Sequence, residues 1–527
     1  MSYLVHDLLS ASAVATPGAE ALVDGARRLD YAALARYVGR AAGLLQARGV
    51  ARGEQVAVYM EKNLEQVGAL FGAAAAGAVF VPVNPLLKPE QVAYILRDCE
   101  VRVLVTSAER LRLLAPSLAG CPALHTVLAV RAGADPAQLP QAAVLDWDTA
   151  LDAAPAPQDR RAIDTDVAAI LYTSGSTGQP KGVVLSHRNM VAGAHSVASY
   201  LENHAGDRLL ALLPLSFDYG LSQLTTAFLR GACVVLINHL LARDVVRAVQ
   251  AERITGLAGV PPLWIQLAAL DWPADCTLRY LTNSGGHLQR ATLDQLRAKL
   301  PNAQPFLMYG LTEAFRSTYL PPAELERRPD SMGKAIPNAE VLVLRPDGSE
   351  CDANEPGELV HRGALVSLGY WNDPARTAER FRPWRAAGGL PLAEMAVWSG
   401  DTVRRDEDGF LYYIGRNDEM IKTSGYRVSP AEVEAVLYAL EDVAEAAALG
   451  VPHPALGQAI VVVVQARPGS TLDGDALLAA CKPQLPAYML PQLVVMAGDS
   501  LPRNPNGKID RKLLAQRHAA AFATEAP

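Results

Sequence analysis

Short apolar runs rich in β-branched residues alternate along the chain with longer amphipathic stretches. The runs have the length and composition of buried strands, and they lie at 55–60, 101–107, 168–174, 233–237 and 278–285. Helix-length segments separate them. This alternation predicts an α/β fold with largely parallel sheets.

One apolar run, residues 67–83 (VGALFGAAAAGAVFVPV), approaches the length of a membrane span. Its Gly and Ala content makes it only weakly hydrophobic, and Pro82 and Pro85 follow a β-rich end. We therefore expect a buried helix of small, closely packed residues that leads into a strand.

The pattern changes near Gly415. A strand-like FLYYIG (410–415) meets a polar segment, and a helix signal follows at 429–440, with Ser429 as the N-cap, Pro430 in the first turn and Glu432 at the capping-box position. Strands are predicted at 444–451, 459–466 and 493–498. We expect a large N-terminal domain of parallel-sheet-rich α/β subdomains over residues 1–415, a small α+β domain up to residue 515, and a disordered tail at 516–527.

Composition and charge exclude several classes of protein. The chain has 527 residues, half of them hydrophobic, and a formal net charge of −7 without a long basic run, so nucleic acid is not expected as a partner. The six cysteines lie far apart without a CxxC pair, which indicates neither a zinc site nor a disulfide framework. The N-terminal segment has no basic leader. A cytoplasmic protein without a membrane span is predicted.

The strongest local motif is TSGSTGQPKG, residues 173–182, directly after the predicted strand at 168–174. Glycines permit close backbone approach, hydroxyls can donate to phosphate oxygens, and a lysine adds positive charge. The spacing does not match a Walker A loop, because Pro180 stands where a second glycine is required. The motif predicts a phosphate-binding loop, with contacts from Thr173, Ser174, Gly175, Ser176, Thr177, Gly178 and Lys181.

This loop resembles the signature of the adenylate-forming superfamily, which comprises acyl-CoA synthetases, peptide-synthetase adenylation domains and luciferases. Further segments match in the family's order, namely SGG (284–286), MYGLTEA (308–314), WSGD (398–401) and GRNDEMIKTSGYR (415–427). The resemblance implies that residues 1–415 form an AMP-binding domain and that ATP and Mg²⁺ are bound. Thr312 would contact the α-phosphate and Glu313 would ligate Mg²⁺, for which a carboxylate oxygen is suited. The other nucleotide contacts implied are Ser284, Gly285, Gly286, Tyr309, Gly310, Asp401 and Arg416.

The family's catalytic lysine is matched by Lys508 in LPRNPNGKIDR (501–511). It would stabilise the charge that develops as pyrophosphate leaves, so Lys508, Thr312 and Glu313 are the catalytic residues that the resemblance implies. The resemblance also implies a hinge at 416–418, centred on Asp418, about which a mobile domain of residues 419–515 rotates. Lys422, Gly425 and Arg427 would then face the thiol.

The acid substrate is less well determined. Phe217 and Asp218 lie in LPLSFDYGLSQL (213–224), where many acyl-CoA synthetases have an aromatic or histidine gate and amino-acid-adenylating domains have an aspartate that pairs with the substrate ammonium. A buried carboxylate is costly without a cation, which makes an amino acid an attractive ligand. The alternative is that Asp218 caps the following helix.

At the level of the whole chain, four further runs carry a narrower resemblance: FVPVNPLLKP, LTNSGG, YGLTEAFRSTYLPP and GKAIPNAEVLVL. They resemble AMP-forming acyl-CoA ligases associated with exosortase A systems, and they are also similar to prolyl-carrier-protein ligases, which share the Phe-Asp pattern. The leading hypothesis is an ATP-dependent, AMP-forming ligase that adenylates a carboxylic acid and transfers the acyl group to the thiol of CoA or of phosphopantetheine. A stand-alone amino acid–carrier-protein ligase, with its carrier supplied in trans, is the second hypothesis. A non-catalytic nucleotide-binding relative is the third, because fold alone does not establish turnover.

Overall fold

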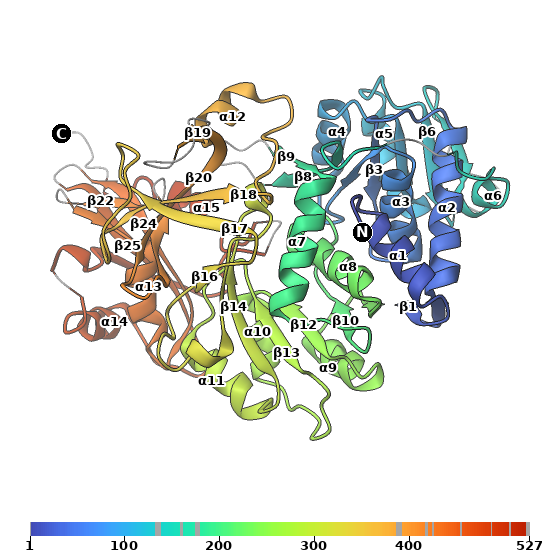
Figure 1. The fold of residues 1–527 in the computed structure, drawn as a ribbon. Helices are drawn as coiled ribbons and strands as arrows, with labels where there is room; N and C mark the ends of the chain where they lie inside the picture. Colours follow the sequence, from blue (N-terminus) through green and yellow to red (C-terminus); the bar gives the residue numbers. More distant parts are fainter. Residues whose placement is uncertain are drawn as a thin grey trace. The chain divides into compact units, whose positions relative to one another are not determined.

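The computed structural model describes residues 2–131, 139–158, 162–173, 180–385, 393–416, 420–423, 426–453, 456–485, 487–504 and 507–522. The chain divides into two compact units (Figure 1). Unit 1 comprises Met1–Val341 and His361–Val397, and unit 2 comprises Leu342–Val360 and Trp398–Pro527. Segments of the predicted 1–415 domain therefore belong to unit 2. The boundary at 415 and the hinge at 416–418 concern domain movement and stay predictions.

The first sheet of unit 1 has seven strands and is parallel except for its last pair. Its order is β7 (Ala143–Asp146), β6 (Thr126–Val130), β5 (Val103–Ser107), β3 (Gln55–Tyr59), β4 (Val79–Pro82), β8 (Val167–Thr173) and β9 (Lys181–Ser186). Helix α2 (Tyr31–Ala47) precedes β3, and the helices between the strands of this sheet are α3 (Leu64–Ala75), α4 (Pro89–Asp98), α5 (Ala108–Leu118) and α6 (Trp147–Asp152). The predicted strands at 55–60, 101–107 and 168–174 are confirmed.

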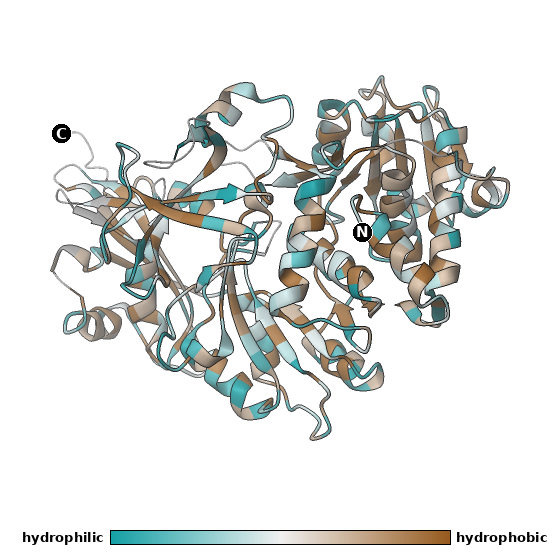
Figure 2. Ribbon diagram, in the orientation of Figure 1, coloured by the Kyte–Doolittle hydropathy of each residue, from teal (hydrophilic) through white to brown (hydrophobic). Residues whose placement is uncertain are grey.

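Both faces of this sheet are buried, which explains why its strands are apolar throughout rather than alternating. Val56 and Val58 of β3 pack with α2 and α3, whereas Ala57 and Tyr59 pack with α4 and α5. Figure 2 shows the strands as nearly continuous hydrophobic segments.

The second sheet of unit 1 has nine strands with a parallel centre. Its order is β16 (Lys334–Ala335), β15 (Thr318–Leu320), β14 (Gln304–Tyr309), β13 (Tyr280–Asn283), β12 (Gly256–Gly259), β10 (Arg208–Ala211), β11 (Cys233–Leu236), β1 (Glu20–Asp24) and β2 (Arg27–Asp30). Its helices are α7 (His187–Tyr200), α8 (Asp218–Arg230), α9 (Ala242–Ala251), α10 (Pro261–Ala268) and α11 (Arg290–Lys299). The predicted strands at 233–237 and 278–285 correspond to β11 and β13.

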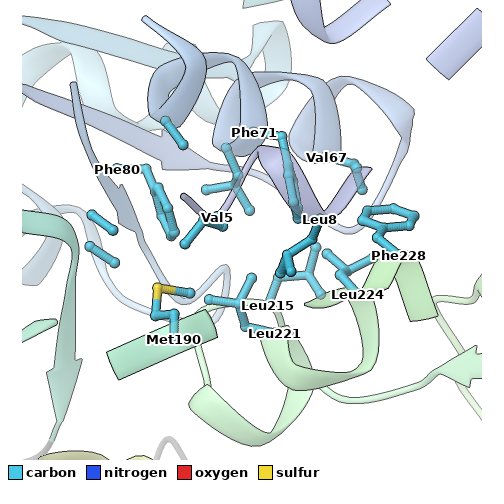
Figure 3. Packing of buried hydrophobic residues seen from close by; sticks show 14 of the residues in the cluster. Val5, Leu8, Val67, Phe71, Phe80, Met190, Leu215, Leu221, Leu224 and Phe228 are labelled. Carbon is cyan, nitrogen blue, oxygen red and sulfur yellow. The ribbon is translucent and has the colours of Figure 1, made fainter. Parts of the chain in front are cut away.

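An apolar cluster joins the helices of the two sheets (Figure 3). Phe71 of α3 meets Phe228 of α8 edge-to-face, with ring centroids 5.1 Å apart, and Leu8 of α1 (Asp7–Ala15) belongs to the same cluster. The apolar run at residues 67–83 forms the buried helix α3 followed by β4, as predicted. Within the described residues, no helix has the length and apolar character needed to cross a membrane.

The chain passes between the two units within three strands of a five-stranded sheet. That sheet has the order β17 (Ala339–Leu344), β18 (Gly357–Gly363), β20 (Glu394–Arg405) and β19 (Phe381–Trp384), and β21 (Leu411–Arg416) also pairs with β20. Helix α12 (Pro374–Arg380) precedes β19.

The C-terminal part of unit 2 is built on a second five-stranded sheet. Its order is β23 (Tyr426–Val428), β22 (Ile421–Thr423), β25 (Gly457–Ala466) and β24 (Val443–His453), with β26 (Leu493–Ala497) also beside β25. Ile460, Val462 and Val464 of β25 pack with α13 (Pro430–Tyr438) and α14 (Gly474–Cys481), and the alternate residues pack toward α15 (Arg511–Arg517). The three strands predicted here are confirmed.

Two local expectations are corrected. Ser429 is the N-cap of α13, but its hydroxyl donates to the carbonyl of Ile414 and makes no capping bond, so the predicted capping box is absent. Residues 516–522 were expected in a disordered tail. Instead α15 extends to Arg517, and the Phe522 ring packs against His453 at 5.1 Å between centroids.

The close contact of α2 and α3 gives a test of the packing. A Cβ atom at Gly72 would lie 2.7 Å from the Cβ of Ala41, so we expect Gly72→Val to lower the free energy of unfolding by about 1–3 kcal/mol through overpacking. The measurement is the midpoint of urea or thermal unfolding. Gly18→Val is the control, because nothing lies within 4 Å of a Cβ there, and an equal loss in both variants would contradict the packing argument.

Candidate active site

The candidate site of unit 1 follows the carboxyl ends of parallel strands. Strands β10, β13 and β14 are parallel members of the nine-stranded sheet, so the segments that follow them emerge at one edge. These segments are the loop into α8, the SGG segment 284–286, and the 3-10 turn Thr312–Ala314. Three motifs that lie far apart in the sequence therefore share an edge.

Lys181, Glu313 and Tyr370 form a hydrogen-bonded cluster. The Lys181 Nζ atom lies 2.7 Å from Glu313 Oε1 and 2.9 Å from the Tyr370 hydroxyl, which itself donates to Glu313 Oε1 at 2.7 Å. The ammonium also lies 4.5 Å from the centre of the Tyr370 ring, a cation–π contact. Lys181 begins β9 of the seven-stranded sheet, so this cluster links the two sheets of unit 1.

This cluster keeps Glu313 ionised although it is buried. Burial raises the pKa of Glu313, but the Lys181 ammonium and the bonds from Lys181 and Tyr370 outweigh it, so the pKa lies below its ordinary value. Burial and the Glu313 charge raise the pKa of Tyr370, which stays a neutral donor. The site therefore presents a carboxylate and an ammonium side by side.

A strained backbone holds Glu313 in place. Phe315 has φ of 55°, uncommon for a non-glycine residue, and its ring is fully buried. Gly193 of α7 makes room for that ring, since a Cβ there would lie 2.3 Å from Phe315 Cδ1. The carbonyl of Glu313 also accepts a hydrogen bond from the backbone of Ser367 at 2.8 Å.

Tyr309 and His361 line the same region. Their rings are stacked with centroids 6.2 Å apart. Burial lowers the pKa of His361 to about 3, although Glu313 opposes this, so the ring is neutral at physiological pH. Its Nε2 atom is buried and has no hydrogen-bond partner among the described residues.

The phosphate-binding loop is described at its two ends. Thr173 is paired with Lys181 across β8 and β9, and the Thr173 hydroxyl is buried without a partner within the described part of the chain. An unsatisfied hydroxyl beside a lysine fits a phosphate oxygen. Ser174, Gly175, Ser176, Thr177 and Gly178 lie outside the described residues.

The SGG segment and the YGLTE segment are shaped by close packing. Gly285 has φ of +81°, which favours glycine, and the Asn283 amide donates to the Gly286 carbonyl at 3.0 Å. Ser284 and Thr312 are buried. A Cβ atom at Gly310 would lie 3.4 Å from the Cα of Arg316.

Asp218 is the first residue of α8 and not its cap, which is Phe217 without a capping bond. The alternative in which Asp218 is the N-cap is therefore wrong. Gly220 permits the close turn here, because a Cβ would lie 2.1 Å from the Pro214 carbonyl oxygen. Asp218 is 7% exposed, and burial raises its pKa although Arg316 opposes the shift. Since a buried arginine already supplies positive charge, an amino acid is not required to balance Asp218.

The predicted ribose contacts lie together in unit 2. Asp401 of β20 pairs with Arg416 of β21, and the Arg416 Nε atom lies 3.5 Å from Asp401 Oδ1. The Asp401 backbone N–H donates to the Ser399 hydroxyl at 3.0 Å, and Gly400 has φ of +74°. The WSGD segment, which lies within β20, thus holds a buried carboxylate in a fixed position.

Lys508 lies in a tight turn of unit 2. Its carbonyl accepts from the Asn504 backbone at 2.8 Å and its N–H donates to Asn504 Oδ1 at 3.1 Å. Gly507 has φ of +78°, and Arg503 donates to the Gly507 carbonyl at 2.8 Å and forms an ion pair with Glu445 of β24. These bonds fix the backbone from which Lys508 extends.

The remaining predicted residues of the thiol side are only partly described. Asp418 and Gly425 lie outside the described residues. Lys422 and Arg427 are backbone partners in the register of β22 and β23, and their roles stay predictions.

Three functional candidates were not predicted: Tyr370, His361 and Arg316. Tyr370 and His361 occur in segments without a recognisable chemical pattern, SLGYW and VHRG, and reach the site only through tertiary pairing such as the Val183–Tyr370 bridge. Arg316 carried a usable signal, because it is a single charge in a run, AFRSTYL, that otherwise has the character of a buried strand.

Comparison with known proteins agrees with this geometry. Residues 9–371 match the family model of the AMP-binding enzymes, and residues 432–508 match that of the AMP-binding enzyme C-terminal domain. Feruloyl-CoA synthase of an Amycolatopsis species is 33% identical, covering 94% of this chain and 95% of the relative. The L-proline–[L-prolyl-carrier protein] ligase of Pseudomonas fluorescens is 32% identical over 98% of this chain and 99% of the relative. The long-chain-fatty-acid–CoA ligase FadD13 of Mycobacterium tuberculosis is 30% identical over 97% and 98%.

Linear gramicidin synthase subunits B and C of Brevibacillus parabrevis are each 30% identical to this chain. The matches cover 99% and 97% of this chain, respectively, but this chain spans only 10% and 6% of the lengths of those subunits. Among solved structures, ATP-bound MatB from Rhodopseudomonas palustris has a TM-score of 0.85 at 26% identity, covering 98% of this chain and 99% of that one. The o-succinylbenzoate CoA synthetase MenE of Bacillus subtilis, in complex with ATP and magnesium ion, has a TM-score of 0.81 at 25% identity, covering 96% and 98%.

The parallel-sheet edge, the paired lysine and glutamate, and the following small α+β fold define an adenylate-forming enzyme. The chain belongs to the AMP-binding enzyme family. The family predicted from its motifs is thereby confirmed.

The ion pair gives a pH-dependent prediction. In Lys181→Met, burial is no longer opposed by the ammonium, so the pKa of Glu313 should rise above its unfolded value. At a pH above the pKa that Glu313 has in the unfolded chain, the buried carboxylate then destabilises the folded state. At more acidic pH, Glu313 is protonated in both the folded and the unfolded state, so this destabilisation disappears. We expect a loss of about 1–3 kcal/mol near pH 8 that shrinks toward pH 5, measured by unfolding across pH.

Adding Glu313→Gln removes the titrating group and is the matched control. We expect the double variant to lose most of this pH dependence. A pH-independent loss in Lys181→Met alone would contradict the ion-pair account.

Proposed function

We propose that the protein binds MgATP through the Thr173–Lys181 and Thr312–Glu313 segments, adenylates a carboxylic acid, and transfers the acyl group to the thiol of CoA. The Lys181–Glu313–Tyr370 cluster carries this proposal. A carboxylate that stays ionised while buried can provide one oxygen ligand to Mg²⁺. The ammonium bonded to it, together with the unpartnered Thr173 hydroxyl, can bind phosphate oxygens.

In the first half-reaction, the acid's carboxylate oxygen attacks the α-phosphorus of ATP and pyrophosphate leaves. Negative charge moves onto the leaving group, and Lys508 is the proposed cation that stabilises it. In the second, the thiolate attacks the acyl carbonyl carbon and AMP leaves with the carboxyl oxygen. Asp401 and Arg416 are proposed to bind the ribose throughout, and Asp418 to be the hinge between the two half-reactions.

The role of Lys508 can be separated from that of the rest of the site. We expect Lys508→Ala to reduce acid-dependent ATP–pyrophosphate exchange by about 100- to 1,000-fold, the usual effect of removing an electrostatic stabiliser. Thioester formation from pre-made acyl-AMP should be little changed. Lys512→Ala, which removes a lysine of α15, is the control. Equal loss in both half-reactions would contradict the assignment.

A stand-alone amino acid–carrier-protein ligase is the second candidate. The similarity to a prolyl-carrier-protein ligase favours it. It differs from the leading proposal in both substrate and acceptor, since the acceptor would be a phosphopantetheine thiol on a separate protein.

Substrate and acceptor can be tested in one experiment. Pyrophosphate exchange is measured with the twenty amino acids beside fatty, aryl and hydroxy acids, and each positive acid is then offered to CoA and to a phosphopantetheinylated carrier protein. We expect exchange with a non-amino acid and thioester formation on CoA. Exchange with one amino acid, lost in Asp218→Ala, together with transfer only to the carrier, would instead establish the second candidate.

A further inference from the structure

The side chain of Arg316 is buried beside the aromatic ring of Tyr219. The residue is 3% exposed, and its Nε atom bonds to no described residue. Its guanidinium carbon lies 4.3 Å from the centre of the Tyr219 ring, which orients the group without satisfying its donors. Buried arginines are ordinarily paired, so Arg316 is available to a ligand.

Asp218 is adjacent to this arginine but does not bond to it. Tyr219, which the guanidinium covers, is the next residue of α8, and Arg316 acts electrostatically on the Asp218 carboxylate. Among the described residues, however, no ion pair within 4 Å joins the two side chains. Each therefore keeps hydrogen-bonding capacity: Arg316 as a donor and Asp218 as an acceptor.

A third polar atom marks the same place. Ser222 lies one helical turn after Asp218, on the same side of α8, and its hydroxyl is buried without a partner in the described part of the chain. The Tyr219 hydroxyl is bonded to Thr282 Oγ1 of β13 at 2.5 Å, which ties this side of α8 to the SGG edge of the sheet. Glu313 also acts on Asp218 electrostatically. The polar group thus lies beside the proposed reaction centre.

We propose that Arg316 and Asp218 form a two-point subsite that selects an acid carrying a hydroxyl group. This inference rests on the proposed function and specifies its substrate class. A hydroxyl can donate to Asp218 and accept from Arg316 at the same time. An ammonium group on the substrate would be attracted by Asp218 but repelled by Arg316. A second carboxylate on the substrate would be attracted by Arg316 but repelled by Asp218. An unsubstituted chain would give neither Arg316 nor Asp218 a further hydrogen-bonding partner, which is costly for buried charged groups.

The test is pyrophosphate exchange with matched acids. Short straight-chain acids of increasing length are compared with counterparts that carry a hydroxyl, an amino or a second carboxyl group at each position. For the best chain length we expect kcat/KM for the hydroxy acid to exceed that for the unsubstituted acid by about 10- to 100-fold, as for sites built to bond a hydroxyl. If no acid of any class supports exchange, the proposed function itself fails.

Two variants should then change selectivity in opposite directions. In Arg316→Met, Asp218 is left without a cation. We therefore expect the preference for the hydroxy acid over the unsubstituted acid to fall by at least about tenfold, and kcat/KM for the amino acid counterpart to rise. In Asp218→Asn, Arg316 is left without an anion, so we expect kcat/KM for the dicarboxylic acid counterpart to rise. Arg110→Met is the control, because it removes another arginine stacked on a tyrosine, at 4.8 Å from the Tyr59 ring, and should keep the wild-type order.

Three results would overturn the proposal. They are equal use of hydroxy and unsubstituted acids at every length, preference of the wild type for an amino acid that Arg316→Met does not alter, and a uniform loss for all acids in both variants while thermal stability is retained. The last would assign the pair a purely structural role.

Discussion

The ion pair between Lys181 and Glu313 is the interaction on which the organisation of unit 1 most depends. It joins the first residue of β9 in one sheet to the turn after β14 in the other. Tyr370 reaches the same pair from a segment that bridges to β9. An ammonium and a carboxylate that stabilise each other out of water fix the relation of the two sheets at the point where phosphate chemistry is proposed. Stability and function are therefore coupled at one place.

The elements and the principal motifs were predictable because they depend on short-range signals. Apolar runs of strand length gave β3, β8 and β11, and the glycine and alanine content of residues 67–83 distinguished a buried helix from a membrane span. Glu313 and Lys181 were predicted as site residues because they lie in motifs that resemble those of the adenylate-forming superfamily. The capping box at Ser429 failed because the hydroxyl had a tertiary acceptor, the Ile414 carbonyl, which no local pattern contains.

The charge balance around Asp218 could not have been read from its own segment. The carboxylate lies at the start of α8, and the arginine that acts on it follows η1 (Thr312–Ala314), nearly a hundred positions along the chain. From the segment alone, a buried acid requires a cation, and the substrate was the natural candidate. The fold supplies that cation from the protein. The same sequence feature thus changes from an argument for an amino acid into a carboxylate that an arginine of the protein partly balances.

The left-handed backbone of Phe315 and the space left by Gly193 have a consequence for protein engineering. Phe315 is the residue before Arg316, so the position from which Arg316 extends is set by a conformation that most side chains tolerate poorly. A mutant library that varies position 316 alone keeps this support and samples new substrates on an intact scaffold. A library that also varies 193 or 315 would mix changes of selectivity with loss of the support, and most of its inactive members would carry no information about the acid.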